Sequence, residues 1–126
     1  MTKISIVIPV FNEEENLPYL NKSLNKALDN QKFDWEVILV DDGSSDNSVK
    51  IWNQLAKEDP KHTKVIVLRR NFGQTPAMAA GIDHSDGDII VMMDADMQND
   101  PADIPMLVEK LNEGFDLVSG WRKNRK

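Results

Sequence analysis

The sequence predicts an α/β protein in which a mainly parallel sheet is flanked by helices, with a single domain over residues 1–126. Two observations support this fold class. First, short apolar segments alternate with amphipathic segments of helical spacing, in the order β-α-β-α-β-α-β-α-β, which implies right-handed crossovers and a parallel sheet. Second, most of the apolar segments are continuous instead of alternating with polar residues, as is typical of strands covered on both faces.

The first half of the chain supplies two strands and two helices. Ile4–Val10 is the first expected strand, and Trp35–Val40 is the second. Between them, leucines recur at helical spacing over Asn16–Asn30, and Pro18 is tolerated in the first turn of a helix. The next helix begins near Asp46, whose carboxylate can cap its N-terminus.

The second half repeats the alternation. Lys64–Leu68 is the third expected strand. Thr75 and Pro76 predict the start of a helix, because a hydroxyl can cap the helix and proline suits its first position. The remaining elements are expected as a strand at Asp88–Met93, a helix at Ala102–Asn112 and a fifth strand at Phe115–Ser119.

Composition excludes several classes of protein. The formal net charge of −6, from 15 basic and 21 acidic residues, argues against general nucleic-acid binding, which depends on neutralising phosphates. The absence of cysteine excludes disulfides and thiolate metal sites, and fits a reducing, cytoplasmic compartment. No apolar run approaches the roughly 20 residues that span a bilayer, and the N-terminus lacks the pattern of a signal peptide.

An acidic cluster follows the fourth strand. In a parallel sheet all strands end at one edge, where ligands bind. Asp94 and Asp96 lie two residues apart, so on an extended chain their side chains point the same way, and Gln98 continues that alternation. Two carboxylates and an amide oxygen are hard ligands suited to Mg²⁺ or Mn²⁺. A bound dication would also offset the repulsion between carboxylates at this edge.

The residues alone leave other interpretations open. Aspartates after a strand are common turn formers and helix caps. A phosphoryl-transfer enzyme also uses strand-end aspartates, although a haloacid-dehalogenase-type phosphatase usually carries Asp-x-Asp on its first strand, and a receiver domain needs a later lysine where Ser119 and Gly120 stand. A noncatalytic nucleotide-binding module is a third interpretation, although the chain has no phosphate loop or Gly-x-Gly-x-x-Gly fingerprint.

Five blocks occur in an order and at a spacing that resemble glycosyltransferase family 2, which has the GT-A fold, a Rossmann-like arrangement. They read SIVIPVFNEEENL, VILVDDGSSDNS, RRNFGQTPAMAAGI, GDIIVMMDADMQNDP and FDLVSGWRKNRK. Within that family the chain is similar to the polyprenyl-phosphate sugar transferases, such as dolichyl-phosphate mannose synthase and its bacterial undecaprenyl-phosphate relatives. The resemblance covers nearly the whole chain and is far more specific than an isolated Asp-x-Asp.

The resemblance implies a role for individual residues. Nucleotide binding is implied for Pro9, Phe11, Glu13, Val40, Asp42, Asp94 and Ala95. Metal binding, of Mg²⁺ or Mn²⁺, is implied for Asp94, Asp96 and Gln98, and catalytic roles for Asp96 and Arg122. The chemistry agrees, because a carboxylate such as Asp42 accepts hydrogen bonds from nucleobase N–H groups and a guanidinium such as Arg122 binds phosphate oxygens in a bidentate way.

The resemblance also implies a reaction, in which a sugar passes from a UDP- or GDP-sugar to a polyprenyl phosphate by metal-dependent inverting displacement. Family members continue well beyond the fifth strand, so the chain is expected to be the N-terminal, donor-binding part of a GT-A domain, without the acceptor half or any membrane segments. We therefore expect weak nucleotide binding and poor transfer by this chain alone, and a full-length protein at the cytoplasmic face of the membrane. An uncovered sheet edge would favour a homo-oligomer.

Overall fold

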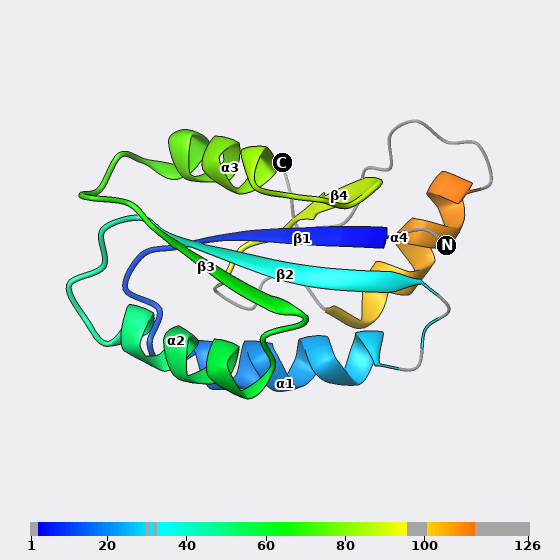
Figure 1. The fold of residues 1–126 in the computed structure, drawn as a ribbon, viewed down its shortest axis with the longest axis horizontal. Helices are drawn as coiled ribbons and strands as arrows, with labels where there is room; N and C mark the ends of the chain where they lie inside the picture. The colour runs from blue at the N-terminus through cyan, green and yellow to red at the C-terminus, as the bar shows by residue number, and fades with distance from the viewer. Residues whose placement is uncertain (1–2, 30, 32, 96–100, 113–126) are drawn as a thin grey trace.

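The computed structural model describes residues 3–29, 31, 33–95 and 101–112. Four strands form one sheet in the order β3-β2-β1-β4, and every neighbouring pair is parallel (Figure 1). The strands are β1 at Lys3–Val10, β2 at Asp34–Asp41, β3 at Thr63–Val67 and β4 at Ile89–Met92. The predicted α/β class with a parallel sheet is therefore confirmed.

Helices cover both faces of this sheet. The helices are α1 at Leu17–Leu28, α2 at Ser48–Glu58, α3 at Gln74–Asp83 and α4 at Ile104–Asn112, with a 3-10 turn, η1, at Pro101–Asp103. Figure 1 shows α1 and α2 side by side below the sheet and α3 above it. Because α1 and α2 cover one face and α3 covers the other, the strands are covered on both sides, as their continuous apolar sequences predicted.

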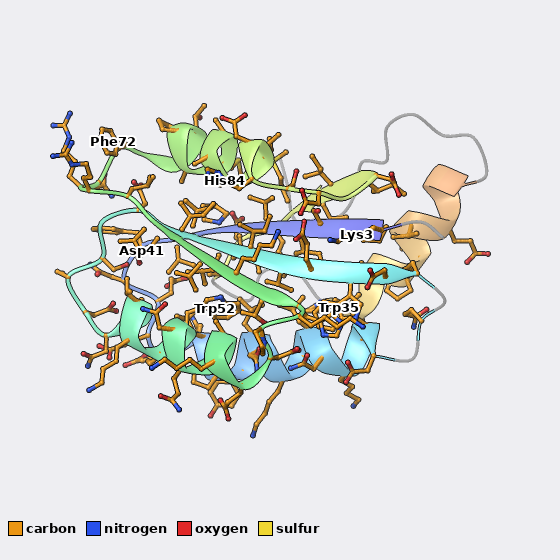
Figure 2. All side chains as sticks on the ribbon, viewed as in Figure 1. Lys3, Trp35, Asp41, Trp52, Phe72 and His84 are labelled. Atoms are coloured by element: carbon orange, nitrogen blue, oxygen red, sulfur yellow. The ribbon has the colours of Figure 1, made fainter. Side chains whose placement is uncertain are left out.

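The larger core lies between the sheet and α1, α2 and α4. Residues that alternate along β1 and β2, including Ile6 and Leu39, pack there against the four leucines of α1 and the fully buried Trp52 (Figure 2). The opposite faces of the same strands carry Val7 and Val40, which pack against α3. In α3, Gly81 approaches β1 so closely that an added Cβ would collide with the Val7 side chain. Small residues in α3 therefore allow this helix to pack directly against the strands.

One predicted detail is wrong. Helix α3 begins at Gln74 and not after Thr75, because Gly73 is the N-cap residue and its φ of 105° lies in the region that favours glycine. At the end of β4, Met93 is buried, whereas Met92 is 43% exposed. The predicted fifth strand, Phe115–Ser119, lies outside the described residues. Within the described part of the chain, no helix has the length and apolarity to cross a membrane.

A buried carboxylate joins the strands at the end of the sheet where they begin. Glu36 on β2 accepts hydrogen bonds from Ser5 Oγ at 2.6 Å and from the backbone N–H of Asp86 at 2.8 Å, and pairs with Lys64 Nζ at 2.7 Å. Burial alone would raise the pKa of Glu36, but these hydrogen bonds and the nearby lysine outweigh it and lower that pKa to about 2. The hydrogen bond to Glu36 in turn raises the pKa of Lys64. Four segments of the fold therefore meet at one ionised group.

Candidate functional site

The carboxyl ends of β1, β2 and β4 meet at the opposite end of the sheet and enclose a pocket of about 290 Å³. Its lining residues are Pro9, Val10, Phe11, Glu13, Asp42, Asn71, Gly73, Asp94 and Ala95. Figure 2 shows Asp41 and Phe72 at this end of the molecule, with Lys3 at the other. The position agrees with the expectation that ligands of a parallel sheet bind where the strands end.

The structure brings together most of the residues that the sequence had singled out for nucleotide binding. Those that line the pocket are Pro9, Phe11, Glu13, Asp42, Asp94 and Ala95. Val40 is the exception, because its side chain is fully buried beneath α3 and does not line the pocket. The other predicted site residues, Asp96, Gln98 and Arg122, lie outside the described residues.

Phe11 is more exposed to solvent than Asp94. The Phe11 ring is 49% exposed, so it is a surface of the pocket and not part of the core. Asp94 lies two residues after the end of β4 and is half-buried, and Ala95 beside it is 3% exposed. An aromatic face and a carboxylate therefore line one cavity, although they come from loops more than 80 residues apart in the sequence.

Asp42 holds the loop that follows β3. Its Oδ1 accepts the N–H of Phe72 at 2.7 Å, and its Oδ2 accepts the N–H of Gly73 at 3.0 Å and the Asn71 side-chain amide at 3.3 Å. A carboxylate offers about four lone-pair sites, so roughly one acceptor position remains. The role of Asp42 seen in the structure is thus to position this loop, with limited capacity left for a nucleobase.

Backbone contact reinforces this arrangement. Gly43 has a φ of 78°, and an added Cβ would lie 2.6 Å from the carbonyl carbon of Arg70. The β2–α2 and β3–α3 loops therefore touch through their backbones, and only glycine permits that approach. Asp42 and Gly43 both contact the loop after β3. These contacts fix the backbone of that loop, and with it the positions of Asn71 and Gly73 at the pocket.

Asn12 connects the first two loops. It has a φ of 53°, the one positive value among described non-glycine residues, and asparagine tolerates this conformation better than most. Its Oδ1 accepts the N–H of Ser45 at 2.8 Å and that of Asp46 at 3.3 Å, while its own N–H donates to Ser44 Oγ at 2.9 Å. Phe11 and Glu13, the sequence neighbours of Asn12, both line the pocket.

The N-cap residue of α2 is Asn47 and not Asp46, but the carboxylate of Asp46 still accepts hydrogen bonds at the start of this helix. Its Oδ1 accepts the N–H and the hydroxyl of Ser48, the first residue of α2, at 2.9 and 2.6 Å, and its Oδ2 accepts the N–H of Glu14. Burial alone would raise the pKa of Asp46, but the hydrogen bonds from Ser48 and Glu14 lower it. Ser48 Oγ also accepts the N–H of Glu13 at 3.0 Å, so the helix start and the pocket loop share one network.

Val10, Asn71 and Gly73 line the pocket but were not among the predicted site residues. A signal for the last two exists in the sequence, because RRNFGQ directly follows the third strand and so had to lie at the ligand edge. What the sequence could not show is that alternate residues of this loop turn inward, since that depends on the hydrogen bonds to Asp42.

The described residues fit part of a metal site. Mg²⁺ usually takes only one or two protein carboxylates and completes its shell with water and phosphate oxygens, and Asp94 supplies one such carboxylate in the pocket. Among the described residues, no group of three or more acidic, histidine or cysteine side chains could hold a metal ion. A complete site would therefore draw on Asp96 and Gln98, which lie beyond the described part.

Comparison with known proteins places these observations in a family. The profile described as glycosyl transferase family 2 matches residues 5–126. The undecaprenyl-phosphate 4-deoxy-4-formamido-L-arabinose transferase of Proteus mirabilis is 46% identical over 125 residues, which is 99% of this chain and 38% of the relative. The chain thus spans little more than a third of the length of that protein.

Solved structures share the arrangement of strands and helices. TarS 1-349 of S. aureus in complex with UDP superimposes with a TM-score of 0.72 at 24% identity, covering 88% of this chain and 32% of that one. Glucosyl-3-phosphoglycerate synthase from Mycobacterium tuberculosis, in complex with Mn²⁺, UDP and phosphoglyceric acid, gives a TM-score of 0.68 at 26% identity, covering 87% of this chain and 39% of that one. With its parallel sheet, its pocket at the strand ends and its matching profile, the chain belongs to glycosyl transferase family 2 and has the corresponding part of the GT-A fold.

Proposed function

We propose that this chain is the donor-binding part of a glycosyltransferase that moves a sugar from a UDP- or GDP-sugar to a polyprenyl phosphate, by metal-dependent inverting displacement at the anomeric carbon. The observation that carries the proposal is the pocket at the carboxyl edge of the sheet, which unites Phe11, Asp42 and Asp94 from three loops. The acceptor class is inferred from the name of the Proteus mirabilis relative, and the donor class from the nucleotide in the TarS complex.

Each residue has a chemical task in this proposal. The exposed face of Phe11 offers a stacking surface for a base, and the remaining acceptor site of Asp42 suits a base N–H. Asp94 would hold the dication together with Asp96 and Gln98, and Arg122 would bind phosphate oxygens. A Mg²⁺ or Mn²⁺ ion supplies charge neutralisation for the departing nucleoside diphosphate when it is bound.

Thermal denaturation tests this proposal. The melting temperature is measured with UDP, GDP, CDP and dTDP, each with and without Mn²⁺. At 100 times its dissociation constant a ligand adds about 2.7 kcal/mol to the free energy of unfolding, which raises the melting temperature by several degrees. We expect a metal-dependent rise with one of these nucleotides, and its loss in Asp94→Asn.

The matched control is Asp83→Asn, which neutralises an exposed aspartate on α3 and should keep the full rise. If phosphate alone stabilises the chain, with or without metal, the strand-end aspartates serve phosphoryl transfer and the proposal is wrong. If no nucleoside diphosphate changes the melting temperature in the presence of Mn²⁺, donor binding by this chain is wrong.

The proposal extends to the whole protein. The chain spans 38% of the Proteus mirabilis transferase, so the acceptor-binding residues are expected in the remaining part of a full-length enzyme at the cytoplasmic face of the membrane. We expect this chain to bind the donor weakly and to transfer sugar at a small fraction of the full-length rate. A radiolabelled sugar nucleotide and a short polyprenyl phosphate test this, and transfer at the full-length rate would contradict it.

A further inference from the structure

We propose that the tip of the loop after β3, formed by Arg69, Arg70 and Phe72 and called here the arginine tip, docks the pocket onto an anionic lipid surface. This inference rests on the proposed function, because a lipid-phosphate acceptor resides in a membrane and the donor pocket must come close to it. The arginine tip is part of the pocket rim, since Asn71 and Gly73 line the pocket from the same loop.

The side chains of the arginine tip face outward although its backbone is fixed. Phe72 donates its N–H to the buried carboxylate of Asp42, yet its ring is 44% exposed. Arg69 and Arg70 are exposed as well. Figure 2 shows Phe72 at the extreme end of the molecule, beyond the ends of the strands. Because Asp42 and Gly43 hold the backbone of this loop, the fold itself directs the side chains of the arginine tip into solvent.

The chemistry of the arginine tip suits a lipid headgroup layer. The Arg70 guanidinium lies 4.7 Å from the centre of the Phe72 ring, so one cation and one apolar ring form a single amphipathic unit. A phenylalanine ring can enter the boundary between headgroups and acyl chains, and arginine keeps its charge in water while its stem covers apolar surface. Two adjacent arginines beside such a ring therefore match anionic headgroups better than a neutral or purely apolar partner.

The acidic body of the protein does not prevent this contact. The net charge is −6, but at physiological ionic strength charges more than about 8 Å apart are largely screened. Attraction to an anionic surface then depends mainly on the charged side chains that lie closest to that surface. Each basic residue at such a surface strengthens binding by about fivefold, so the pair contributes about 25-fold.

Vesicle co-sedimentation of the 126-residue chain tests the proposal without nucleotide. The vesicles contain equal parts of phosphatidylglycerol and phosphatidylcholine, and pure phosphatidylcholine vesicles serve as the comparison. We expect binding to the anionic vesicles only, weakened by added salt. The double variant Arg69→Glu, Arg70→Glu should lose at least about 25-fold in binding.

Two matched controls separate the arginine tip from general effects. Lys57→Glu, Lys61→Glu makes the same change in charge at exposed positions near the start of β3, at the opposite end of the sheet, and should bind as the unmodified chain does. Phe72→Ser should weaken binding about tenfold, whereas Tyr19→Ser, at a ring that is 67% exposed on α1, should not. All of these side chains are exposed, so circular dichroism should show a folded protein throughout.

The outcomes separate this inference from the proposed function. Absence of binding by the unmodified chain, or equal loss in the arginine and lysine variants, overturns the docking surface. If the arginine variant binds vesicles normally but loses the nucleotide-dependent rise in melting temperature, the arginines serve the donor phosphates and the docking surface is again wrong. Loss of vesicle binding specific to the arginine tip supports it, even if no nucleotide stabilises the chain.

Discussion

At the scale of single residues, two side chains at the ligand end of the sheet, Asn12 and Asp42, fix the loops around the pocket. Asn12 holds Ser45 and Asp46 by their backbone N–H groups, and Asp42 holds Phe72 and Gly73 in the same way. Each of them satisfies donors in a loop that would otherwise be free to take several conformations. The pocket residues on these loops therefore owe their positions to the hydrogen bonds that Asn12 and Asp42 accept.

Asn12 provides a prediction at this scale. Asn12→Ala should lower the free energy of unfolding by roughly 1–2 kcal/mol, because it removes the acceptor for two N–H groups and places a non-glycine Cβ without side-chain compensation at positive φ. Asn12→Gly should recover part of this loss, since glycine accepts the backbone conformation but lacks the acceptor. Urea denaturation measures both variants.

The control for this prediction is Asn53→Ala on the exposed face of α2, which should change the free energy of unfolding by no more than about 0.5 kcal/mol. If Asn12→Gly were as unstable as Asn12→Ala, backbone conformation would have no part in the effect. If neither variant differed from the unmodified protein, the hydrogen bonds of Asn12 would not stabilise the loops.

At the scale of secondary-structure elements, the two ends of the sheet are held together differently. At the ligand end, three loops interlock through hydrogen bonds between side chains and backbone. At the opposite end, Glu36 on β2 connects β1 through Ser5, β3 through Lys64, and the segment before β4 through the N–H of Asp86. The second arrangement involves an ionised carboxylate, so it depends on pH.

Glu36 predicts how stability responds to acid. Its pKa is lowered from 4.5 to about 2 in the folded protein, so its stabilising contribution is complete above the unfolded value of 4.5 and is lost as the pH falls towards 2. The difference corresponds to about 3 kcal/mol of unfolding free energy. Urea denaturation between about pH 6 and pH 2 should show this decrease, and Glu36→Gln should lack it.

Glu58→Gln provides the comparison for the acid prediction. It removes an exposed carboxylate near the end of α2, away from Glu36, and should keep the pH dependence of the unmodified protein. An unchanged pH dependence in Glu36→Gln would show that the buried network does not link stability to pH in this range.

At the scale of the whole molecule, β4 is one of the two edge strands of the described sheet, and it carries exposed apolar side chains. It pairs with β1 in the order β3-β2-β1-β4, and its Ile90 and Met92 are 38% and 43% exposed. Their partners in register are Ser5 and Val7, and Val7 packs against α3, so the exposed pair lies on the α3 side of the sheet. Exposed apolar edge strands are prone to pair with another chain.

The homo-oligomer expected from the sequence remains a prediction, and we predict that its subunits associate through β4. Sedimentation velocity should show association that increases with protein concentration, and Ile90→Lys should shift the protein to monomer, because a charged edge residue opposes pairing. Met106→Lys on α4 is the control, since Met106 is 50% exposed and α4 packs on the face of the sheet opposite to α3. A monomer at every concentration would contradict this prediction.

The order of the described elements, their approximate bounds and most of the residues that line the pocket could be predicted from the sequence. Largely apolar runs such as Ile4–Val10 are typical of strands that are buried on both faces, and parallel strands must end at one edge. Six of the predicted nucleotide-binding residues do line one pocket. These features are local in the sequence or follow directly from topology.

Tertiary structure alone decided which residues of each loop turn inward. Val40 lies near the end of β2, and only the position of α3 shows that its side chain is fully buried and does not line the pocket. Asn71 and Gly73 reach the pocket while Phe72 points outward, because Asp42, about 30 residues earlier, accepts their hydrogen bonds. Such contacts join segments that are distant in sequence, and their geometry depends on the packing of the whole fold, so no local pattern encodes them.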